Sequence, residues 1–428
     1  MGIIENKRID EKLYFRKLDS GLNIYFMPRK GYMQKYAIFA TDYGSNDNHF
    51  IPIGEREPIK VPAGVAHFLE HKLFEDEEMD IFDRFSRLGT NVNAYTNANQ
   101  TAYLCSTTAN FYESLQLLIK FVQNPYFTDS NVEKEKGIIE QEIRMYEDSP
   151  NWRGYSNCLN GMYVDHPVRI DIAGTVESIQ DIDKEVLYQC YNTFYNPSNM
   201  VLFIAGDLSF ERIVDIVEGT ERKDLRKGIE EISRVYPNEP VGIQKQYIED
   251  RLATSIPLFS IGIKDNNLNM MNRELVHKDL VTNILLEILF GDSSEFYNDL
   301  YGKGLVDNSF TSYFTGKVDY GYSLVLGQSN EPDRVFDKVL KHIKATKKTG
   351  ISGEAFRRIK NKNMGGFLMG LNSLSLISSY FIDNYFEGFL FIDVLDILDS
   401  IEIGDVNARL VDDIDEETMV LSVVNPMS

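Results

Sequence analysis

The stretch GVAHFLEHKLFEDEE, residues 64–78, decides how this sequence is interpreted, because it places two of only six histidines four residues apart. His67 and His71 are separated by one helical turn, and Glu70 immediately precedes the second histidine. Pro62 suits a first helical turn, and no helix breaker interrupts the motif. At about 100° per residue, the two imidazoles and the carboxylate share one face of the predicted helix.

The rest of this helix is small or apolar, which predicts that it is buried. Ala63 and Gly64 lie on the face of the histidines and leave room for another group to approach. Buried imidazoles and a carboxylate need a common partner, and a divalent metal serves all three. Two imidazoles one turn apart can bind zinc, while a carboxylate that does not bind the metal deprotonates water. The pattern H-x-x-E-H is the inverted zinc-peptidase signature; the alternative is a pair of surface histidines beside a glutamate by chance.

A third metal ligand is expected from DSNVEKEKGIIEQEIRMYED, residues 129–148. Ser130 and Glu133 predict a capping box at the start of an amphipathic helix. Glu135 and Glu142 interrupt its apolar stripe and lie about 10 Å apart along the axis. One glutamate is therefore expected to bind the metal and the other to orient a ligand or the water; the alternative is that both reach solvent. The expected stripe comprises Val132, Ile138, Ile139, Ile143, Met145 and Tyr146.

Length and charge narrow the class of protein. A chain of 428 residues exceeds one ordinary core, and 43% hydrophobic residues indicate a globular protein. The formal net charge of −21 argues against a nucleic-acid partner, since such proteins neutralise phosphates, and would suit a basic peptide. Acidic runs such as FEDEEMD are most simply solvated surfaces.

The cysteines and the lengths of the apolar runs indicate in which cellular compartment the protein is expected. Cys105, Cys158 and Cys190 are far apart and odd in number, so they predict no closed disulfide framework. The sequence shows neither a signal-peptide core nor an apolar run of the roughly 20 residues that a membrane helix needs. The expectation is a cytoplasmic protein without a membrane span.

The order of predicted elements repeats at a spacing of about 220 residues. In the first half, a strand at 35–44 precedes the histidine helix, a strand-like stretch at 91–107 and two further helices. The second half shows the same order from a strand at 256–265 to a strand-like stretch at 312–328. This pattern predicts an α+β protein with two homologous α/β sandwich domains related by an internal repeat.

We place the predicted domain boundaries around a charged stretch that contains proline. The expected domains are a zinc-bearing domain at 1–220, a linker at 221–240 and a homologous domain at 241–428 that lacks the motif.

These motifs resemble the insulinase/pitrilysin-type zinc metallopeptidases, in particular the bacterial branch related to mitochondrial processing peptidase. HFLEH resembles the H-x-x-E-H of that family, and EKGIIEQE, residues 135–142, resembles its downstream helix with two glutamates. The resemblance implies that His67, His71 and Glu142 bind Zn²⁺, that Glu70 is catalytic and that Glu135 supports catalysis.

The segment NAYTNANQTAY resembles the family's edge strand, which holds the substrate backbone. The resemblance assigns substrate binding to Asn93 and Ala94, and pairing through the backbone would tolerate varied side chains.

The second half departs from the family pattern in NDLYGKGLVDNSF, residues 298–310. Active members carry an arginine and a tyrosine that contact the substrate and the developing oxyanion, but this alignment places Leu300 and Asp307 there. Tyr301 and Lys303 are nearby candidate substitutes. The resemblance therefore implies the zinc-bearing subunit of a heterodimer whose related partner supplies the pair, with a homodimer as the alternative.

The expected activity is zinc-dependent endopeptidase hydrolysis of peptides or unstructured segments. A non-catalytic peptide-binding subunit is the alternative, favoured by the missing arginine and tyrosine. The intact motif and both downstream glutamates favour the enzyme. A scaffold without metal would leave the two glutamates of the apolar stripe without partners.

Overall fold

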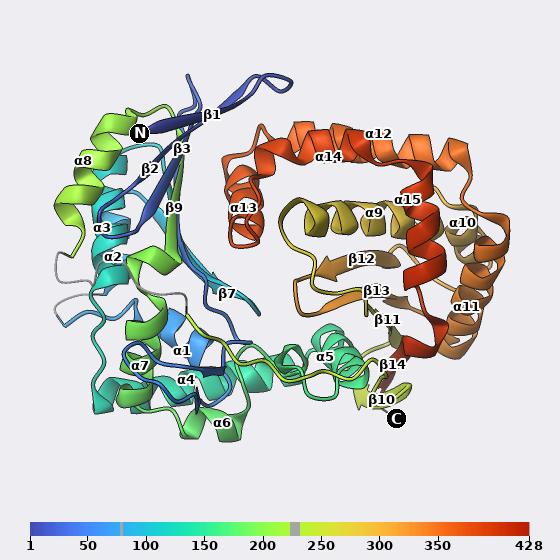
Figure 1. Ribbon diagram of the computed structural model, residues 1–428. Coiled ribbons are helices and arrows are strands. Elements are labelled where there is room, and N and C mark those ends of the chain that lie inside the picture. Colours follow the sequence, from blue (N-terminus) through green and yellow to red (C-terminus); the bar gives the residue numbers. More distant parts are fainter. Residues whose placement is uncertain (78–79, 223–231, 428) are drawn as a thin grey trace. The chain divides into compact units, whose positions relative to one another are not determined.

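A computed structural model describes residues 1–77, 80–222 and 232–427, and its chain forms two compact units (Figure 1). Neither unit is one continuous segment. Unit 1 comprises Met1–Ile143, Ile170–Tyr236 and Gly370–Asp383. Unit 2 comprises Arg144–Arg169, Pro237–Met369 and Asn384–Ser428.

The described residues of unit 1 form a seven-stranded sheet in the order β1-β2-β3-β9-β4-β8-β7. Its central strands are continuously apolar because both of their faces are covered, and every residue of β9 is buried. A separate pair, β5 (His49–Phe50) and β6 (Ile59–Lys60), is antiparallel. The seven strands are β1 (Gly2–Asn6), β2 (Glu11–Lys17), β3 (Asn23–Pro28), β4 (Lys35–Thr41), β7 (Asn91–Thr96), β8 (Thr101–Thr107) and β9 (Met200–Gly206).

Helices cover this sheet on both sides, with α2, α3 and α8 on one side and α13 on the other (Figure 1). On the α13 side, Phe381 stacks on Phe203 and contacts Tyr25. The helices of this region are α1 (Val65–Lys72), α2 (Ile81–Arg87), α3 (Phe111–Gln123), α4 (Asp129–Glu147), α6 (Val176–Gln180), α7 (Lys184–Phe194), η2 (Pro197–Asn199), α8 (Phe210–Thr220) and α13 (Leu374–Tyr385).

The described residues of unit 2 form a five-stranded sheet in the order β10-β14-β11-β13-β12. Its first pair is parallel and the others are antiparallel, as in β3-β9-β4-β8-β7 of unit 1. The predicted fold of two related sandwiches is thus confirmed. The strands are β10 (Tyr247–Leu252), β11 (Leu258–Lys264), β12 (Thr311–Gly316), β13 (Gly321–Gln328) and β14 (Met419–Pro426).

Each long strand-like stretch of the sequence is a hairpin in the structure. Residues 91–107 form β7 and β8, and residues 312–328 lie in β12 and β13. The helices of unit 2 complete the repeat. They are α5 (Pro150–Met162), η1 (Pro167–Arg169), α9 (Asn272–Phe290), α10 (Glu295–Gly302), α11 (Pro332–Thr349), α12 (Gly353–Gly370), η3 (Phe391–Asp393), α14 (Val394–Ser400), α15 (Ile403–Ala408), η4 (Arg409–Asp413) and η5 (Glu416–Thr418).

The two repeats exchange one helix each. Helix α5 comes from the first half of the sequence but packs on β11 and β14 of unit 2. Gly262 permits this packing, because a Cβ atom there would lie 2.6 Å from the Cys158 sulfur and 2.7 Å from that of Met162. Helix α13 comes from the second half, and its residues up to Asp383 belong to unit 1. The exchange places segments of each half outside the contiguous domains expected from the sequence.

The predicted linker at 221–240 includes residues 223–231, which lie outside the described residues. Among the described residues, no single helix has both the length and the apolar character to cross a membrane. Helices α12 and α13 meet these criteria only when taken together, and they are bent by 113°.

Candidate metal centre

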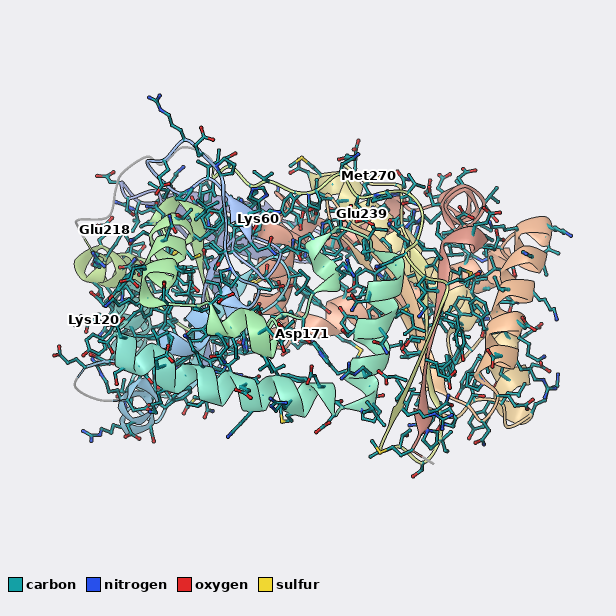
Figure 2. All side chains as sticks on the ribbon, turned by 90° about the horizontal axis from the view of Figure 1, so that it is seen from below. Lys60, Lys120, Asp171, Glu218, Glu239 and Met270 are labelled. Carbon is teal, nitrogen blue, oxygen red and sulfur yellow. The ribbon has the colours of Figure 1, made fainter. Side chains whose placement is uncertain are left out.

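The histidine helix α1 starts later than its sequence predicts. Pro62 lies before the helix, so the expectation that it occupies the first turn is wrong. The helix begins after Gly64, whose φ of +94° is a left-handed conformation that favours glycine. A Cβ atom at Gly64 would lie 2.4 Å from the Ala173 carbonyl oxygen. Ala173 belongs to the turn that starts at Asp171, labelled in Figure 2, so this turn fixes where α1 begins.

The start of α4 also differs from its prediction. Thr128 Oγ1 accepts a hydrogen bond from the Asn131 N–H at 3.2 Å, and Asn131 Oδ1 accepts one from the Thr128 N–H at 2.8 Å. This reciprocal pair is the capping box, so the prediction that Ser130 and Glu133 form it is wrong. The cap lies two residues earlier because the short Asn131 side chain takes the role expected of Glu133.

The apolar stripe of α4 is narrower than predicted. Val132, Ile139 and Ile143 are buried in the core of unit 1. Ile138 is 45% exposed and Met145 is 59% exposed, so their assignment to the buried stripe is wrong. The buried face is therefore confined to positions three, four or seven residues apart, and Glu135 lies on it.

Three predicted ligands converge between α1 and α4. One ligand atom from each of His67, His71 and Glu142 lies within 4.8 Å of the other two. The Glu142 carboxylate is 3.7 Å from His67 Nε2 through Oε1 and 3.4 Å from His71 Nε2 through Oε2. This separation leaves space for a cation that all three groups could bind.

Glu135 contacts the opposite side of the His71 ring. Its Oε1 atom lies 3.1 Å from His71 Nδ1, and its Oε2 atom lies 3.4 Å from Lys72 Nζ. A proton on Nδ1 directed at Glu135 leaves the lone pair of Nε2 facing Glu142. Burial raises the pKa of Glu135, but the hydrogen bond from His71 and the Lys72 charge outweigh it, so the pKa is lowered. Glu135 is therefore an anion, and it orients the His71 ring.

Glu70 lies beside β7. Thr96 Oγ1 donates a hydrogen bond to Glu70 Oε2 at 2.7 Å. Burial raises the pKa of Glu70, and the hydrogen bond from Thr96 and the nearby His71 only partly oppose this effect. A carboxylate with a raised pKa is a better proton acceptor, which suits a general base.

The two histidines have opposite protonation preferences in the metal-free protein. Burial, followed by the positive charge of His71, lowers the pKa of His67 to about 3. Burial also disfavours the charged form of His71, but the hydrogen bond to Glu135 and the charges of Glu135, Glu142 and Glu70 raise its pKa. His67 therefore stays neutral at neutral pH, whereas a proton on His71 would compete with a metal at this site.

The donor set fits zinc. Two imidazole nitrogens and one carboxylate are the three protein ligands of many catalytic zinc sites. Among the described residues, His67 Nδ1 is buried without a hydrogen-bond partner, so Glu135 orients only one of the two rings.

Asn93 and Ala94 lie on β7, the last strand in the order of the sheet. The Ala94 N–H donates to Asn93 Oδ1 at 3.0 Å, so this backbone group does not point toward β8. An N–H group in this position can pair with an added peptide strand once the Asn93 side chain moves away.

Leu300 and Asp307 have structural roles in unit 2. Leu300 is 0% exposed and belongs to the core. Asp307 Oδ1 accepts hydrogen bonds from the N–H and the hydroxyl of Ser309 at 2.9 and 2.5 Å. Of the nearby candidates, Tyr301 is exposed and Lys303 pairs with Asp299. Neither Leu300 nor Asp307 offers a side-chain hydrogen-bond donor.

Lys72 and Thr96 are two contributors that the motifs did not single out. Lys72 is 0% exposed, and its ammonium pairs with Glu75 at 2.5 Å as well as with Glu135. A lysine directly after HFLEH on a buried helix was the available signal, since buried lysines need anionic partners. Thr96 lies within the quoted NAYTNANQTAY segment, but only the fold brings it to Glu70.

Comparison with protein families identifies the class to which this chain belongs. Residues 49–176 match the profile described as Insulinase (Peptidase family M16), and residues 181–363 match Peptidase M16 inactive domain. The chain therefore belongs to peptidase family M16, which confirms the resemblance inferred from its motifs.

Individual relatives support this membership over nearly the full chain. It is 41% identical over 425 residues to the protein named Uncharacterized zinc protease YmfH of Bacillus subtilis strain 168, and the match covers 99% of each chain. An uncharacterized zinc protease of Rickettsia felis is 25% identical, with 92% of this chain and 93% of the relative covered.

Solved structures agree with the fold. The crystal structure of an M16-like peptidase from Alicyclobacillus acidocaldarius matches with a TM-score of 0.94 and 40% identity, covering 99% of this chain and 100% of that one. A protease from Helicobacter pylori matches with a TM-score of 0.80, covering 97% and 100%, and its 18% identity supports the fold alone.

Proposed function

We propose that this chain is a zinc-dependent endopeptidase that hydrolyses peptides or unstructured segments. The observation that carries the proposal is the convergence of His67, His71 and Glu142, with Glu70 placed between this group and the edge strand β7. The zinc protease names of the relatives support the same class of reaction.

The three converging side chains would hold zinc, which polarises a carbonyl and acidifies water when bound. Glu70 then accepts a proton from the attacking water and donates it to the leaving amine. Thr96 holds the Glu70 carboxylate toward β7. Glu135 keeps the His71 ring oriented and is itself held by Lys72.

The substrate would bind as an added strand on β7. Pairing through the backbone at Asn93 and Ala94 places the peptide next to Glu70, because Thr96 of the same strand contacts that carboxylate. Such pairing needs an extended segment, which is why folded proteins would be poor substrates.

We further propose that the active form is a heterodimer in which this chain bears the zinc. The side chains of Leu300 and Asp307 cannot donate the hydrogen bonds that an arginine and a tyrosine supply to substrate and oxyanion. A related chain would supply that pair. A homodimer is the competing assembly, and mixing purified chains of known mass distinguishes the two.

Metal content and peptide cleavage test the proposal together. One zinc per chain, with cleavage of a quenched-fluorescent peptide library that a chelator abolishes, is the expected result. Glu70→Gln should keep the zinc and reduce cleavage by at least about 1,000-fold, because the proton acceptor is lost. Glu113→Gln, at an exposed glutamate of α3, is the matched control. Unchanged turnover by Glu70→Gln would refute the role of Glu70.

A non-catalytic peptide-binding subunit is the second candidate, favoured by the same replacements at Leu300 and Asp307. The expected result for that candidate is one zinc per chain and saturable peptide binding without cleavage, even after a related partner is added. Restored cleavage on adding a partner that carries the arginine and tyrosine decides for the heterodimeric enzyme.

A further inference from the structure

Strand β7 presents different side chains to the two sides of its sheet. Ala94 packs toward the core and Thr96 reaches Glu70, so both face the helix layer that carries the metal ligands. Because side chains alternate along a strand, Asn93 and Tyr95 face the opposite side. That side is covered in part by α13 (Figure 1).

Gln100 joins β7 to α13 on this opposite side. Its Nε2 atom donates to the Tyr95 hydroxyl at 3.4 Å and to Asp383 Oδ1 at 3.2 Å. Gln100 is buried, whereas Asp383 is exposed at the end of the unit 1 part of α13. Burial, and then the charge of Asp383, raise the pKa of Tyr95, so its ring stays neutral beside the carboxylate.

An added peptide strand would bring one of its side chains to this cluster. The Ala94 N–H is directed away from β8, so a peptide residue opposite Ala94 would share backbone hydrogen bonds with it. The next peptide residue, opposite Tyr95, would form a pair without hydrogen bonds, in which facing side chains lie closer together. Its side chain would point to the side of Tyr95 and Asp383.

We propose that Tyr95, Gln100 and Asp383 form a specificity subsite for a positively charged side chain of the bound peptide. This proposal rests on the proposed function and deepens it, because it names the substrate class. The carboxylate attracts an arginine or lysine, and the aromatic ring offers a face to the same cation. The net charge of −21 attracts basic peptides over a longer range.

The alternation of side chains gives the subsite a recognisable signature. A basic residue should be favoured at one peptide position. The only other positions where it could be favoured are those two residues away, because their side chains point to the same side. The immediate neighbours of the favoured position point to the helix layer and should show no such preference. General attraction by the net charge would instead favour a basic residue at every position.

A position scan with peptides tests the subsite. One arginine is moved through an otherwise neutral quenched-fluorescent peptide, and each peptide is paired with its citrulline analogue, which has a similar shape but no charge. For the zinc-loaded full chain we expect kcat/KM to favour arginine about tenfold at the subsite position. Asp383→Asn should reduce that ratio to about one, and Asp383→Lys should make the position favour glutamate over glutamine.

Asp215→Asn, at an exposed aspartate of α8, is the matched control and should keep the wild-type ratio. An arginine preference that survives in Asp383→Asn, or that is equal at every position, would overturn the subsite. Absence of any cleavage contradicts the proposed hydrolysis instead. Fluorescence anisotropy of the same peptides then decides on the subsite, since Asp383→Asn and not Asp215→Asn should abolish the tighter binding of the arginine peptide.

Discussion

Two pairs of helices occupy equivalent places in the two repeats, α1 with α4 in unit 1 and α9 with α12 in unit 2. In unit 1 the side chains between the helices are His67, His71 and Glu142. In unit 2 a direct ion pair between Glu287 and Lys362 joins the helices. Lys362 lies 220 positions after Glu142, which is the spacing of the repeat.

This difference distinguishes the residues that the sandwich fold requires from those that the candidate metal site requires. Unit 2 shows that the same strand order and helix pair persist with an ordinary, partly exposed ion pair. Acids and imidazoles gathered in a half-buried space repel or remain poorly solvated without a cation. Stability therefore does not explain the cluster of unit 1, and this supports the proposed metal binding.

Replacing Glu142 should have the largest effect. Glu142→Gln removes one of three ligands, so we expect zinc affinity to fall on the order of 1,000-fold, more than the roughly 10- to 100-fold typical of residues that orient ligands. Lys362→Met, at the equivalent place, should leave zinc affinity unchanged and cost less than about 0.5 kcal/mol, since the pair is partly exposed. Competition with a chromophoric chelator measures the affinity; wild-type binding by Glu142→Gln would contradict the assigned ligand.

The start of α1 is the next most sensitive point. Gly64→Ala should cost about 3 kcal/mol, because φ is +94° and the new methyl group meets the Ala173 carbonyl. Helix α9 starts differently, after Met271 in an extended conformation. Gly31→Ala is the control, since Gly31 also has a positive φ but open space around it, and should cost only about 1 kcal/mol. Equal losses in denaturant unfolding would show that the contact with Ala173 is unimportant.

Zinc affinity should depend on pH through His71. The pKa of His71 in the metal-free protein is raised, so below that pKa a proton competes with the metal. Affinity should then fall about tenfold for each pH unit, while His67, with a pKa of about 3, adds no second proton near neutrality. Titrations from pH 8 to 5 measure the slope. A loss of two protons would contradict the neutral state of His67.

The smallest expected effect is on the pH dependence of stability, and it comes from Asp279 on α9 of unit 2. Among the described residues, its buried Oδ1 atom has no hydrogen-bond partner, and burial raises its pKa to about 7. The unfolded chain releases this proton near pH 4, so the carboxyl should make the protein less stable as pH rises from about 4 to 7.

Asp279→Asn has no such titration and should gain about 2 to 3 kcal/mol over the wild type at pH 8 relative to pH 5. Thermal unfolding of zinc-depleted protein at both values measures this difference. An identical pH dependence in the two proteins would show that Asp279 is ionised throughout.

The parts of the site that local spacing determines were predictable. His67, Glu70 and His71 share a helix face by periodicity, and Glu135 and Glu142 were conspicuous as acids within an apolar stripe. The start of α1 could not be predicted from the sequence, because it depends on a turn more than 100 residues away at Ala173. The capping box was misplaced because Asn131 and Glu133 are both plausible partners, and only backbone geometry selects between them.

The two related sandwiches were predictable in outline, since the order of elements repeats along the sequence. The exchange of α5 and α13 was not, because helical periodicity reveals that a face is apolar but not which sheet will cover it. Gly262 is explained only once the structure is known, because it lies close to Cys158 and Met162 of α5.

That exchange limits how the chain can be divided. A fragment that ends near residue 236 would retain α5 without the sheet it covers and would lack α13 on its own sheet. The complementary fragment would have the converse defect. The two repeats are therefore not interchangeable modules, although their folds match. In evolutionary terms, the exchange would tie the two copies together, because losing either one would leave a helix without its sheet and a sheet without its helix.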